Sequence, residues 1–198
     1  MKLFYSPQTR SSRIVWLLEE AGVDYALVPI VLGAEDQPVE FVAASPMRKV
    51  PAIQDGDVAM ADSAAIAIYV ADRYPEAGLA PAIDDPARGQ YLYWCIYTPG
   101  VIEPAMVEKM SGIEPNRRSY GWGSFDLMVS TLENALETGP WLLGERFSAA
   151  DIMTGSAVVF MRMFDLLPES EILDAYAERC LERPAYQHAL KMDEPGQN

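Results

Sequence analysis

The chain changes character near residue 80, and this change constrains its fold more than any other feature of the sequence. Before that point, short β-like runs alternate with amphipathic helical runs, which is the pattern of an α/β unit. After it, almost every segment has helical periodicity. We therefore predict an α/β domain over residues 1–76, a linker over residues 77–85 and an all-helical domain over residues 86–198. A chain of 198 residues is long enough for two small hydrophobic cores.

The first domain is predicted to run β-α-β, then a variable segment, then β-β-α. In that topology the loop after the first strand and the start of the last helix lie at the same edge of the sheet. The expected elements are a strand over residues 2–5, a helix through Ile14 and Ala21 that Gly22 closes, a strand over residues 25–31 that Pro29 restricts to an edge, a hairpin of residues 52–54 and 58–60, and a helix from Ser63 that stops before Pro75.

The second domain is predicted to be a series of helices. One of them has a strong start signal, because Ser148 and Asp151 form a capping box and Phe147 and Ile152 are spaced as a hydrophobic staple. We interpret that signal as a folding determinant. The tail after Glu194 is expected to be disordered. The predicted helices cover residues 87–98, 102–110, 120–137, 152–164, 173–181 and 185–191, the first ending at Thr98-Pro99-Gly100.

Charge and cysteine content narrow the class of partner. The chain has 15 Lys and Arg against 29 Asp and Glu, and its net charge of −14 repels nucleic acid phosphate and anionic lipid. No apolar run approaches the roughly 20 residues of a membrane span. Cys95 and Cys180 lie far apart without a CxxC or His/Cys cluster, which argues against a disulfide framework and a zinc site. We expect a cytoplasmic protein without a metal, whose partners are small molecules or protein.

Two short segments predict a pocket for a peptide-like thiol. Pro51 stands at the head of a predicted strand, where it cannot donate to a ladder. If the Val50-Pro51 bond is cis, the amide and carbonyl of Val50 turn outward and can pair with a peptide-like ligand. Asp62 and Ser63 open a helix whose free N–H groups attract a carboxylate. The alternative interpretation is that these residues are ordinary strand and helix punctuation.

The order of these motifs resembles the cytosolic glutathione transferase family along essentially the whole chain. The resemblance implies a thioredoxin-like N-terminal domain, an all-helical C-terminal domain and a two-fold homodimer. It also implies that glutathione binds mainly to the first domain and that a hydrophobic co-substrate lies between the two. The matching motifs are residues 1–7 (MKLFYSP), 13–20 (RIVWLLEE), 45–51 (SPMRKVP), Asp62-Ser63, 147–152 (FSAADI) and 183–185 (RPA).

The resemblance also implies how glutathione is bound. Arg48 stands where many relatives carry glycine, so the loop around it is expected to have a different shape. Val50, beside Pro51, is implied to pair with the cysteinyl backbone, and Arg10 with a carboxylate or the thiolate. Ser63 is implied to bind the γ-glutamyl carboxylate, and Asp62 the γ-glutamyl ammonium of its own or the neighbouring subunit's ligand. Lys49 is implied to bind the glycyl carboxylate, with Gln37 as a further glycyl contact.

The glutathione thiol must ionise to attack an electrophile quickly. A hydroxyl donor and a helix N-terminus favour the thiolate, and residues 6–12 supply both. In an ungapped overlay, the serine of serine-type relatives falls on Thr9 and the cysteine of cysteine-type relatives falls on Arg10. Thr9 is our first choice for the hydroxyl, Ser11 the second and Tyr5 the third, with charge from Arg10 as another route. The alternative is that Thr9 and Ser11 cap the first helix.

The co-substrate side and the reaction leave alternatives open. Three reactions or roles fit the sequence: conjugation of glutathione to electrophiles, glutathione-dependent reduction of disulfides or hydroperoxides, and non-catalytic binding. The absence of cysteine from residues 6–12 argues against a protein mixed disulfide. A candidate apolar wall, which the same pattern also predicts as plain helix core, consists of Tyr91, Trp94, Tyr97, Met106, Met110 and Trp122.

Overall fold

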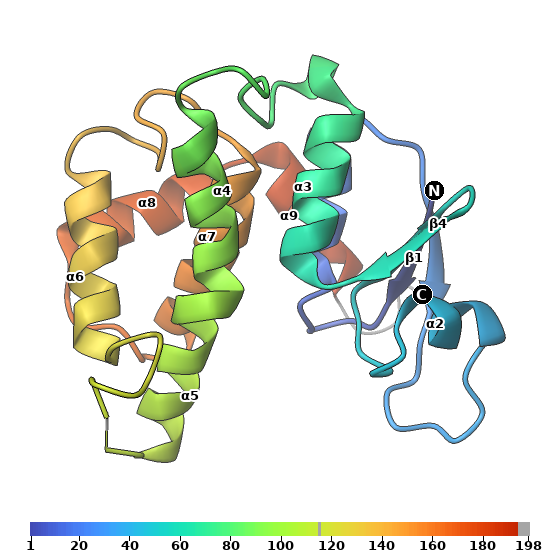
Figure 1. Cartoon of the computed structure of the whole chain (residues 1–198), viewed down its shortest axis with the longest axis horizontal. Coiled ribbons are helices and arrows are strands. Elements are labelled where there is room, and N and C mark those ends of the chain that lie inside the picture. The colour runs from blue at the N-terminus through green and yellow to red at the C-terminus, as the bar shows by residue number, and fades with distance from the viewer. Residues whose placement is uncertain (115, 194–198) are drawn as a thin grey trace. The chain divides into compact units, whose positions relative to one another are not determined.

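A computed structural model describes residues 1–114 and 116–193. These residues form two compact units (Figure 1). The first comprises Met1–Leu79 together with the segment that begins at Arg183, and the second comprises Ala80–Glu182. The tail after Glu194, predicted to be disordered, lies outside the described residues.

The first unit contains the predicted β-α-β and β-β-α parts around one mixed sheet, and the variable segment between them forms a short helix. The strands lie in the order β2-β1-β3-β4, with β1 parallel to β2 and antiparallel to β3. Pro29 lies in the edge strand β2, as the sequence predicts. The elements are β1 (Lys2–Tyr5), α1 (Ser12–Glu20), β2 (Ala26–Pro29), α2 (Val39–Ala44), β3 (Ala52–Asp55), β4 (Val58–Ala61), α3 (Ser63–Arg73), the 3₁₀ turn η1 (Pro75–Ala77) and α9 (Pro184–Met192).

The two faces of this sheet carry different layers. On one face Phe4 packs against Phe41 of α2, with 5.6 Å between ring centroids, in a buried cluster that includes Ile30 and Ala52. Side chains alternate along a strand, so Leu3 and Ile53, both fully buried, face the other side. Helices α1 and α3 pack against each other in that second layer (Figure 1).

The last helix joins the first unit, whereas the sequence assigns residues 86–198 to a single helical domain. The reason lies in α1, where residues 13–18 are all buried, so that helix needs a cover on its outer side. Helix α9 supplies it: the rings of Trp16 and Tyr186 lie 4.5 Å apart. The guanidinium of Arg183 donates to both carboxylate oxygens of Glu20 at 2.5 and 2.7 Å. The outer face of α1 is therefore buried by a segment from the far end of the chain.

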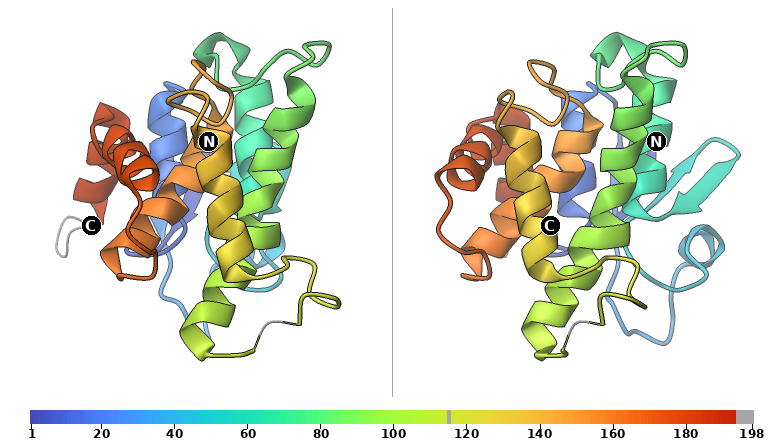
Figure 2. Two further views of the ribbon diagram at one scale, coloured as in Figure 1. Left: turned by 90° about the vertical axis from the view of Figure 1, so that its left-hand side faces the viewer. Right: turned by 60° about the vertical axis from the view of Figure 1, so that its left-hand side comes forward.

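The second unit is helical, as predicted. Helix α7 packs against α4 and α8, and Figure 2 shows this arrangement from two further sides. Eleven of the 15 residues of α7 are buried, on every side of the helix, so α7 lies at the centre of this unit. The elements are α4 (Arg88–Tyr97), a π-helical segment η2 (Thr98–Ile102), α5 (Glu103–Ser111), α6 (Phe125–Leu136), α7 (Ala149–Met163) and α8 (Glu171–Leu181).

The predicted break at Thr98-Pro99-Gly100 is wrong. Helical backbone continues from α4 through η2 into α5. Pro99 and Pro104 lack the N–H that a regular α-helix would bond to the carbonyls four residues earlier. The wider π register lets the chain pass this stretch without ending the helix. Buried Thr98 also contacts Thr154 of α7, with 3.2 Å between the hydroxyl oxygens, which ties the segment to the centre of the unit.

Helix α6 begins at Phe125, five residues later than the sequence predicts. Ser124 has extended backbone and its hydroxyl accepts a hydrogen bond from the N–H of Leu127 at 3.3 Å. That is the geometry of an N-cap. Residues 120–123 form turns instead, because the cap defines the first helical turn.

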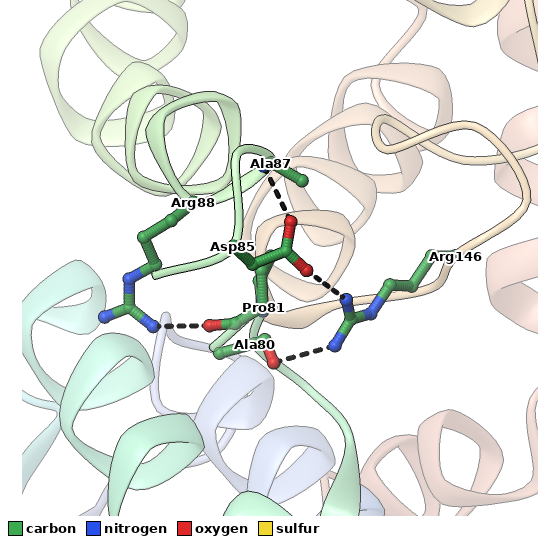
Figure 3. Close-up of polar contacts among 6 residues, drawn as sticks. All are labelled: Ala80, Pro81, Asp85, Ala87, Arg88 and Arg146. Carbon is green, nitrogen blue, oxygen red and sulfur yellow. Dashed lines mark hydrogen bonds and ion pairs between the residues drawn. The ribbon is translucent and has the colours of Figure 1, made fainter. Parts of the chain in front are cut away.

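The start of the second unit is tied down by two arginines (Figure 3). Asp85 accepts from the N–H of Ala87 at 2.8 Å, in the turn that precedes α4. Arg146 donates to the carbonyl of Ala80 at 2.9 Å and contacts Asp85 at 3.4 Å. Arg88 donates to the carbonyl of Pro81 at 3.0 Å. Residues 80–85 of the predicted linker are therefore a held loop of this unit.

The predicted capping box at Ser148 and Asp151 is confirmed. Both residues are fully buried. One carboxylate oxygen of Asp151 accepts from the N–H and the hydroxyl of Ser148, at 2.9 and 3.1 Å. The other accepts from the N–H of Leu142 at 2.9 Å and from the hydroxyl of Tyr176 at 3.1 Å. Asp151 thus joins the start of α7 to the preceding loop and to α8.

We expect the stability of the protein to carry a pH-dependent contribution from Asp151. Burial raises the pKa of this carboxyl from 3.8 to about 6, against the opposing effect of its hydrogen bonds. The folded state then holds the proton more tightly than the unfolded state does. This contribution is fully present below pH 3.8 and is lost as the pH rises through about 6.

The comparison with Asp151→Asn, which does not titrate, isolates this effect. Between about pH 4 and about pH 7 the free energy of unfolding of the parent should fall relative to the variant by on the order of 2–3 kcal/mol. Urea unfolding at several pH values measures the difference. A difference that stays constant with pH would show that the pKa is not raised.

Candidate functional site

Three predicted site segments meet at one end of the sheet. Phe4 of β1 pairs with Ala52 of β3, and Ala52 pairs with Ala61 of β4. The loop that follows β1, the turn that precedes β3 and the residues that follow β4 therefore leave the sheet at the same end. These are residues 6–11, residues 48–51 and Asp62-Ser63. The predicted convergence of these segments is thus present in the strand register.

The turn before β3 has the features that a peptide-binding edge needs. The Val50-Pro51 bond is cis, and both residues lie before the first residue of the sheet ladder. The buried hydroxyl of Ser45 holds the main chain of Lys49 on both sides: it accepts from the N–H at 3.0 Å and donates to the carbonyl at 2.8 Å. Arg48 has φ 54°. Arg48 thus adopts the left-handed conformation that glycine takes most easily. The sequence predicts a loop shape that differs from that of relatives with glycine at this position.

The start of α3 carries a residue with unusual backbone geometry. Asp62 has φ 78°, a costly conformation for a residue other than glycine. Its Oδ1 accepts from the N–H groups of Ala64 and Ala65, at 2.9 and 3.2 Å, so it is the N-cap of the helix. Ser63 follows as the first helical residue and is 7% exposed. The described residues provide no hydrogen-bond partner for its hydroxyl, which leaves that group available beside the positive end of the helix dipole.

The loop after β1 contains a triangle of oxygen atoms. The hydroxyl of Thr9 lies 2.7 Å from the carbonyl oxygen of Ser6 and 2.6 Å from the hydroxyl of Ser11, and the Ser11 hydroxyl lies 2.8 Å from the same carbonyl. Two hydroxyl protons serve these three contacts. The N–H of Ser11 donates to the Thr9 oxygen at 3.2 Å. Redirecting the Thr9 proton toward a ligand therefore costs only one hydrogen bond, about 1 kcal/mol.

The three predicted hydroxyl candidates differ in accessibility. Thr9 is half-buried, whereas Ser11 is fully buried and also accepts the N–H of Ser6 at 3.1 Å. Tyr5 is 1% exposed and donates to the carboxylate of Asp193. Burial and that hydrogen bond raise the pKa of Tyr5. Neither Ser11 nor Tyr5 presents its hydroxyl outward.

The alternative that Thr9 and Ser11 cap the first helix is wrong for Ser11 only, because the Thr9 hydroxyl accepts the N–H of Ser11 just before the helix. Ser11 occupies the N-cap position of α1 but makes no side-chain capping bond, and its backbone is already helical at φ −68° and ψ −23°. The Ser11 hydroxyl instead bonds within the loop, to Ser6 and Thr9. The helix begins directly beside Thr9, since the N–H of Ser12 donates to the Thr9 carbonyl at 3.1 Å.

Of the residues predicted to contact the ends of glutathione, Lys49 and Arg10 lie where the site segments meet, and Gln37 does not. Lys49 and Arg10 are exposed on two of the converging segments. Gln37 belongs to the loop between β2 and α2, where its amide donates to the carbonyls of Val31 and Ala34, at 2.7 and 3.2 Å. Its side chain thus closes its own loop, and the strand register does not bring it to the end of the sheet where the other segments meet.

Sequence reasoning missed Asp193, which follows α9 and contacts the loop after β1. Its Oδ1 accepts the N–H of Gln8 at 3.0 Å as well as the Tyr5 hydroxyl. No local pattern in the sequence marks it, because its partners lie 185 and 188 residues earlier.

The predicted apolar wall is largely interior to the second unit. Tyr91, Trp94, Tyr97 and Met106 are buried, and Met110 is 62% exposed. Half-buried Trp122 stacks on Tyr120 and donates to Glu108 at 2.8 Å. The burial of Tyr91, Trp94, Tyr97 and Met106 favours the alternative that these four residues are plain helix core.

One aromatic cluster of the second unit still reaches the surface. The rings of Trp94 and Tyr97 lie 4.9 Å apart, and Tyr93 lies 4.9 and 5.3 Å from them. Tyr93 is 48% exposed and was not among the predicted residues. Its exposure comes from the face of α4 that it occupies, one position before buried Trp94.

Within residues 1–114 and 116–193, no three His, Cys, Asp or Glu side chains are grouped so that they could hold a metal ion. In the same part of the chain no helix has the length and apolar content needed to cross a bilayer. Both cysteines are buried and form no disulfide.

Comparison with known proteins places this geometry in a family. The chain matches "Glutathione S-transferase, N-terminal domain" over residues 1–72 and "Glutathione S-transferase, C-terminal domain" over residues 69–181. It is 30% identical over 164 residues to the disulfide-bond oxidoreductase YfcG of Escherichia coli strain K12, which covers 76% of this chain and 75% of YfcG.

Solved structures agree with these matches. BphK, a bacterial GST solved as a ternary complex, has a TM-score of 0.81 and 27% identity, over 98% of this chain and 99% of BphK. A sphingomonad glutathione S-transferase complexed with glutathione has a TM-score of 0.77 and 26% identity, over 98% of both chains. With the thioredoxin-like sheet, the helical unit and both domain matches in place, the chain belongs to the glutathione S-transferase family.

Proposed function

We propose that this protein conjugates the thiolate of glutathione to hydrophobic electrophiles. The observation that carries the proposal is the register of β1, β3 and β4, which brings a hydroxyl-bearing loop, a free main-chain edge and a helix start to one end of the sheet. Each of these three features suits one part of a cysteine-containing tripeptide. The family to which the chain belongs supports the same reaction.

The helix start and the main-chain edge would bind the tripeptide. The hydroxyl of Ser63 and the N-terminus of α3 suit the γ-glutamyl carboxylate, and the carboxylate of Asp62 suits the γ-glutamyl ammonium. The main chain of Val50, beside Pro51, suits antiparallel pairing with the cysteinyl residue. Exposed Lys49 supplies positive charge for the glycyl carboxylate, which matters in a protein of net charge −14. Exposed Arg10 is a further cationic group beside the same loop.

The loop after β1 would hold the sulfur as a thiolate. Only the thiolate is a strong nucleophile, so a group that stabilises it relative to the thiol raises the reactive fraction at neutral pH. We assign this role to Thr9, because it is the least buried of the three candidate residues and lies in the loop that leads into α1. Donation from Thr9 and the partial positive charge of the helix start both favour the ionised sulfur.

The electrophile is assigned only by chemical class. Surface-exposed Tyr93, with Trp94 and Tyr97 behind it, forms an aromatic cluster that suits an apolar and preferably aromatic compound. This cluster replaces the larger predicted wall in the proposal, since most of that wall is buried.

A second candidate is glutathione-dependent reduction of disulfides, which the 30% identity to YfcG favours. Glutathione thiolate would attack the mixed disulfide of a second glutathione, forming glutathione disulfide and releasing the substrate thiolate. Residues 6–12 contain no cysteine, so the protein itself would form no mixed disulfide. An assay with a small glutathione mixed disulfide separates this reaction from conjugation to an aryl halide.

Replacing Ser63 by Ala should raise the dissociation constant of glutathione about ten-fold or more, through the loss of one hydrogen bond to a charged group. Isothermal titration calorimetry measures it. The matched control is Ser130→Ala in α6, whose hydroxyl bonds only within its own helix. An unchanged dissociation constant in Ser63→Ala would refute the assignment. Binding without turnover of an aryl halide, a hydroperoxide or a mixed disulfide would instead indicate a non-catalytic binding protein.

We also propose that the protein acts in the cytoplasm as a two-fold homodimer. The buried Cys95 and Cys180, which form no disulfide, suit a reducing compartment. Closed two-fold symmetry is the commonest assembly of soluble oligomers and is what the family resemblance implies. Light scattering coupled to gel filtration tests the assembly: a mass of twice 21.9 kDa supports it, and a mass of 21.9 kDa refutes it.

A further inference from the structure

We propose that Asp193 is a positioning residue for the loop that activates the thiol. Its carboxylate fixes the turn at Gln8 and so sets the direction of the neighbouring Thr9 hydroxyl. The inference rests on the proposed function for its catalytic consequence, but its structural part, the restraint of Gln8, is independent of any reaction.

The contacts converge on one oxygen atom. Asp193 Oδ1 accepts the N–H of Gln8 at 3.0 Å and the hydroxyl of Tyr5. The Tyr5 hydroxyl also lies 3.0 Å from the carbonyl oxygen of Met192. Tyr5 is the last residue of β1 and is 1% exposed, so one of the two partners is rigidly held by the sheet. The carboxylate therefore connects a fixed strand end to the loop that follows it.

The helix that presents Asp193 is itself anchored. Helix α9 is held on α1 by the paired hydrogen bonds between Arg183 and Glu20 and by the contact between Trp16 and Tyr186. Asp193 is the C-cap residue of this helix, with its own N–H bonded to the carbonyl of Leu190 at 3.1 Å. It therefore reaches the loop from a platform that does not depend on the loop.

The position of this carboxylate is not explained by the stability of α9. A negative charge at a helix C-terminus is unfavourable, because the helix dipole is negative at that end. The hydrogen bonds that Asp193 accepts from Gln8 and Tyr5 offset that cost. Asp193 therefore stabilises the loop after β1 and not helix α9.

The loop needs such a restraint. Gln8 has φ 56°, a conformation that a residue other than glycine adopts only when its surroundings impose it. From inside, the loop is held by Ser11, which bonds to both the N–H and the carbonyl of Ser6. From outside, Asp193 holds the N–H of Gln8. Thr9 lies between these two restraints, so the loss of either one changes the direction of its hydroxyl.

The expected kinetic effect is on turnover and not on glutathione binding. Asp193 contacts neither the turn before β3 nor the start of α3, where the proposed binding groups lie. A small displacement of a positioned catalytic group costs much more in rate than in affinity. Asp193→Ala should therefore lower kcat with an aryl halide about ten-fold while the KM for glutathione stays within about two-fold.

The experiment compares three variants. Asp193→Ala removes the acceptor, and Asp193→Asn keeps an acceptor oxygen but removes the charge. Glu182→Ala is the matched control, because Glu182 is the exposed C-cap residue of α8 and contacts no part of the loop. Amide hydrogen exchange of Gln8, measured by NMR without glutathione, is the readout that does not depend on activity, and kcat and KM are measured in parallel.

The proposal expects Gln8 exchange to accelerate about ten-fold or more in Asp193→Ala, because its N–H loses its partner. Asp193→Asn should keep both the protection and the rate, and Glu182→Ala should behave as the parent. Unchanged Gln8 exchange in Asp193→Ala overturns the proposal. The proposal is also overturned if Asp193→Ala and Asp193→Asn lose kcat equally while Gln8 stays protected in both, because the loss of rate would then come from the missing charge. A parent protein without turnover refutes the proposed function alone, and the exchange data then still decide whether Asp193 restrains Gln8.

Discussion

Replacing Asp151 by Ala is expected to lower the free energy of unfolding by about 3 kcal/mol or more. The fully buried carboxylate accepts four hydrogen bonds, from Leu142, from both donors of Ser148 and from Tyr176. Alanine leaves these donors without an acceptor, and each unsatisfied buried polar group costs about 1–3 kcal/mol. The effect should exceed that of an ordinary lost N-cap, about 1 kcal/mol, because the same side chain also joins α7 to α8.

Equilibrium unfolding in urea at one protein concentration measures this change. Glu171→Ala is the matched control, since Glu171 is an exposed acid in the first turn of α8 and its loss should cost less than about 1 kcal/mol. Equal denaturant midpoints for Asp151→Ala and the parent would show that the buried network does not hold the second unit together.

Replacing Thr9 by Ala is expected to reduce kcat for conjugation of an aryl halide about 10-fold to 100-fold, the range for loss of one donor to a developing or held negative charge. Glutathione affinity should change about two-fold at most, because the groups proposed to bind its ends lie on the other two segments. The pKa of bound glutathione should rise in the variant, since the ionised sulfur loses a hydrogen bond. Its ultraviolet thiolate absorbance as a function of pH measures that shift.

Thr9→Ser is the control that keeps the hydroxyl and removes the methyl group. It should retain most of the activity, because the serine oxygen can occupy the same place in the triangle with Ser6 and Ser11. If Thr9→Ala turns over as fast as the parent, Thr9 has no role in thiol activation, and exposed Arg10 becomes the group to test next.

Features encoded within a few neighbouring residues were predictable. The capping box at Ser148 and Asp151 and the closing glycine of α1 are examples, since Gly22 has φ 62° and its N–H bonds to Glu19 at 3.2 Å. The hairpin of β3 and β4 and the start of α3 also follow from local turn and capping chemistry. Because the order of these elements dictates which strand ends share a sheet edge, the meeting of three site segments was predictable too.

Features that depend on how a loop or a set of helices packs in three dimensions were not predictable. The burial of Ser11, which removes it as a candidate, follows from contacts made inside a folded loop, and alternation or spacing carries no trace of it. The continuous passage from α4 to α5 depends on a π register that neighbouring helices hold in place.

The sequence by itself determined the α/β and helical halves, the strand order along the chain and the residues that begin each site segment, because these depend on short-range patterns of burial and capping. Only the tertiary structure decided that α9 covers α1 and that Asp193 reaches Gln8 across 185 residues. The physical reason is that any suitable segment of the chain can cover an apolar helix face or accept a hydrogen bond from a loop N–H. Which segment does so is settled by packing in three dimensions.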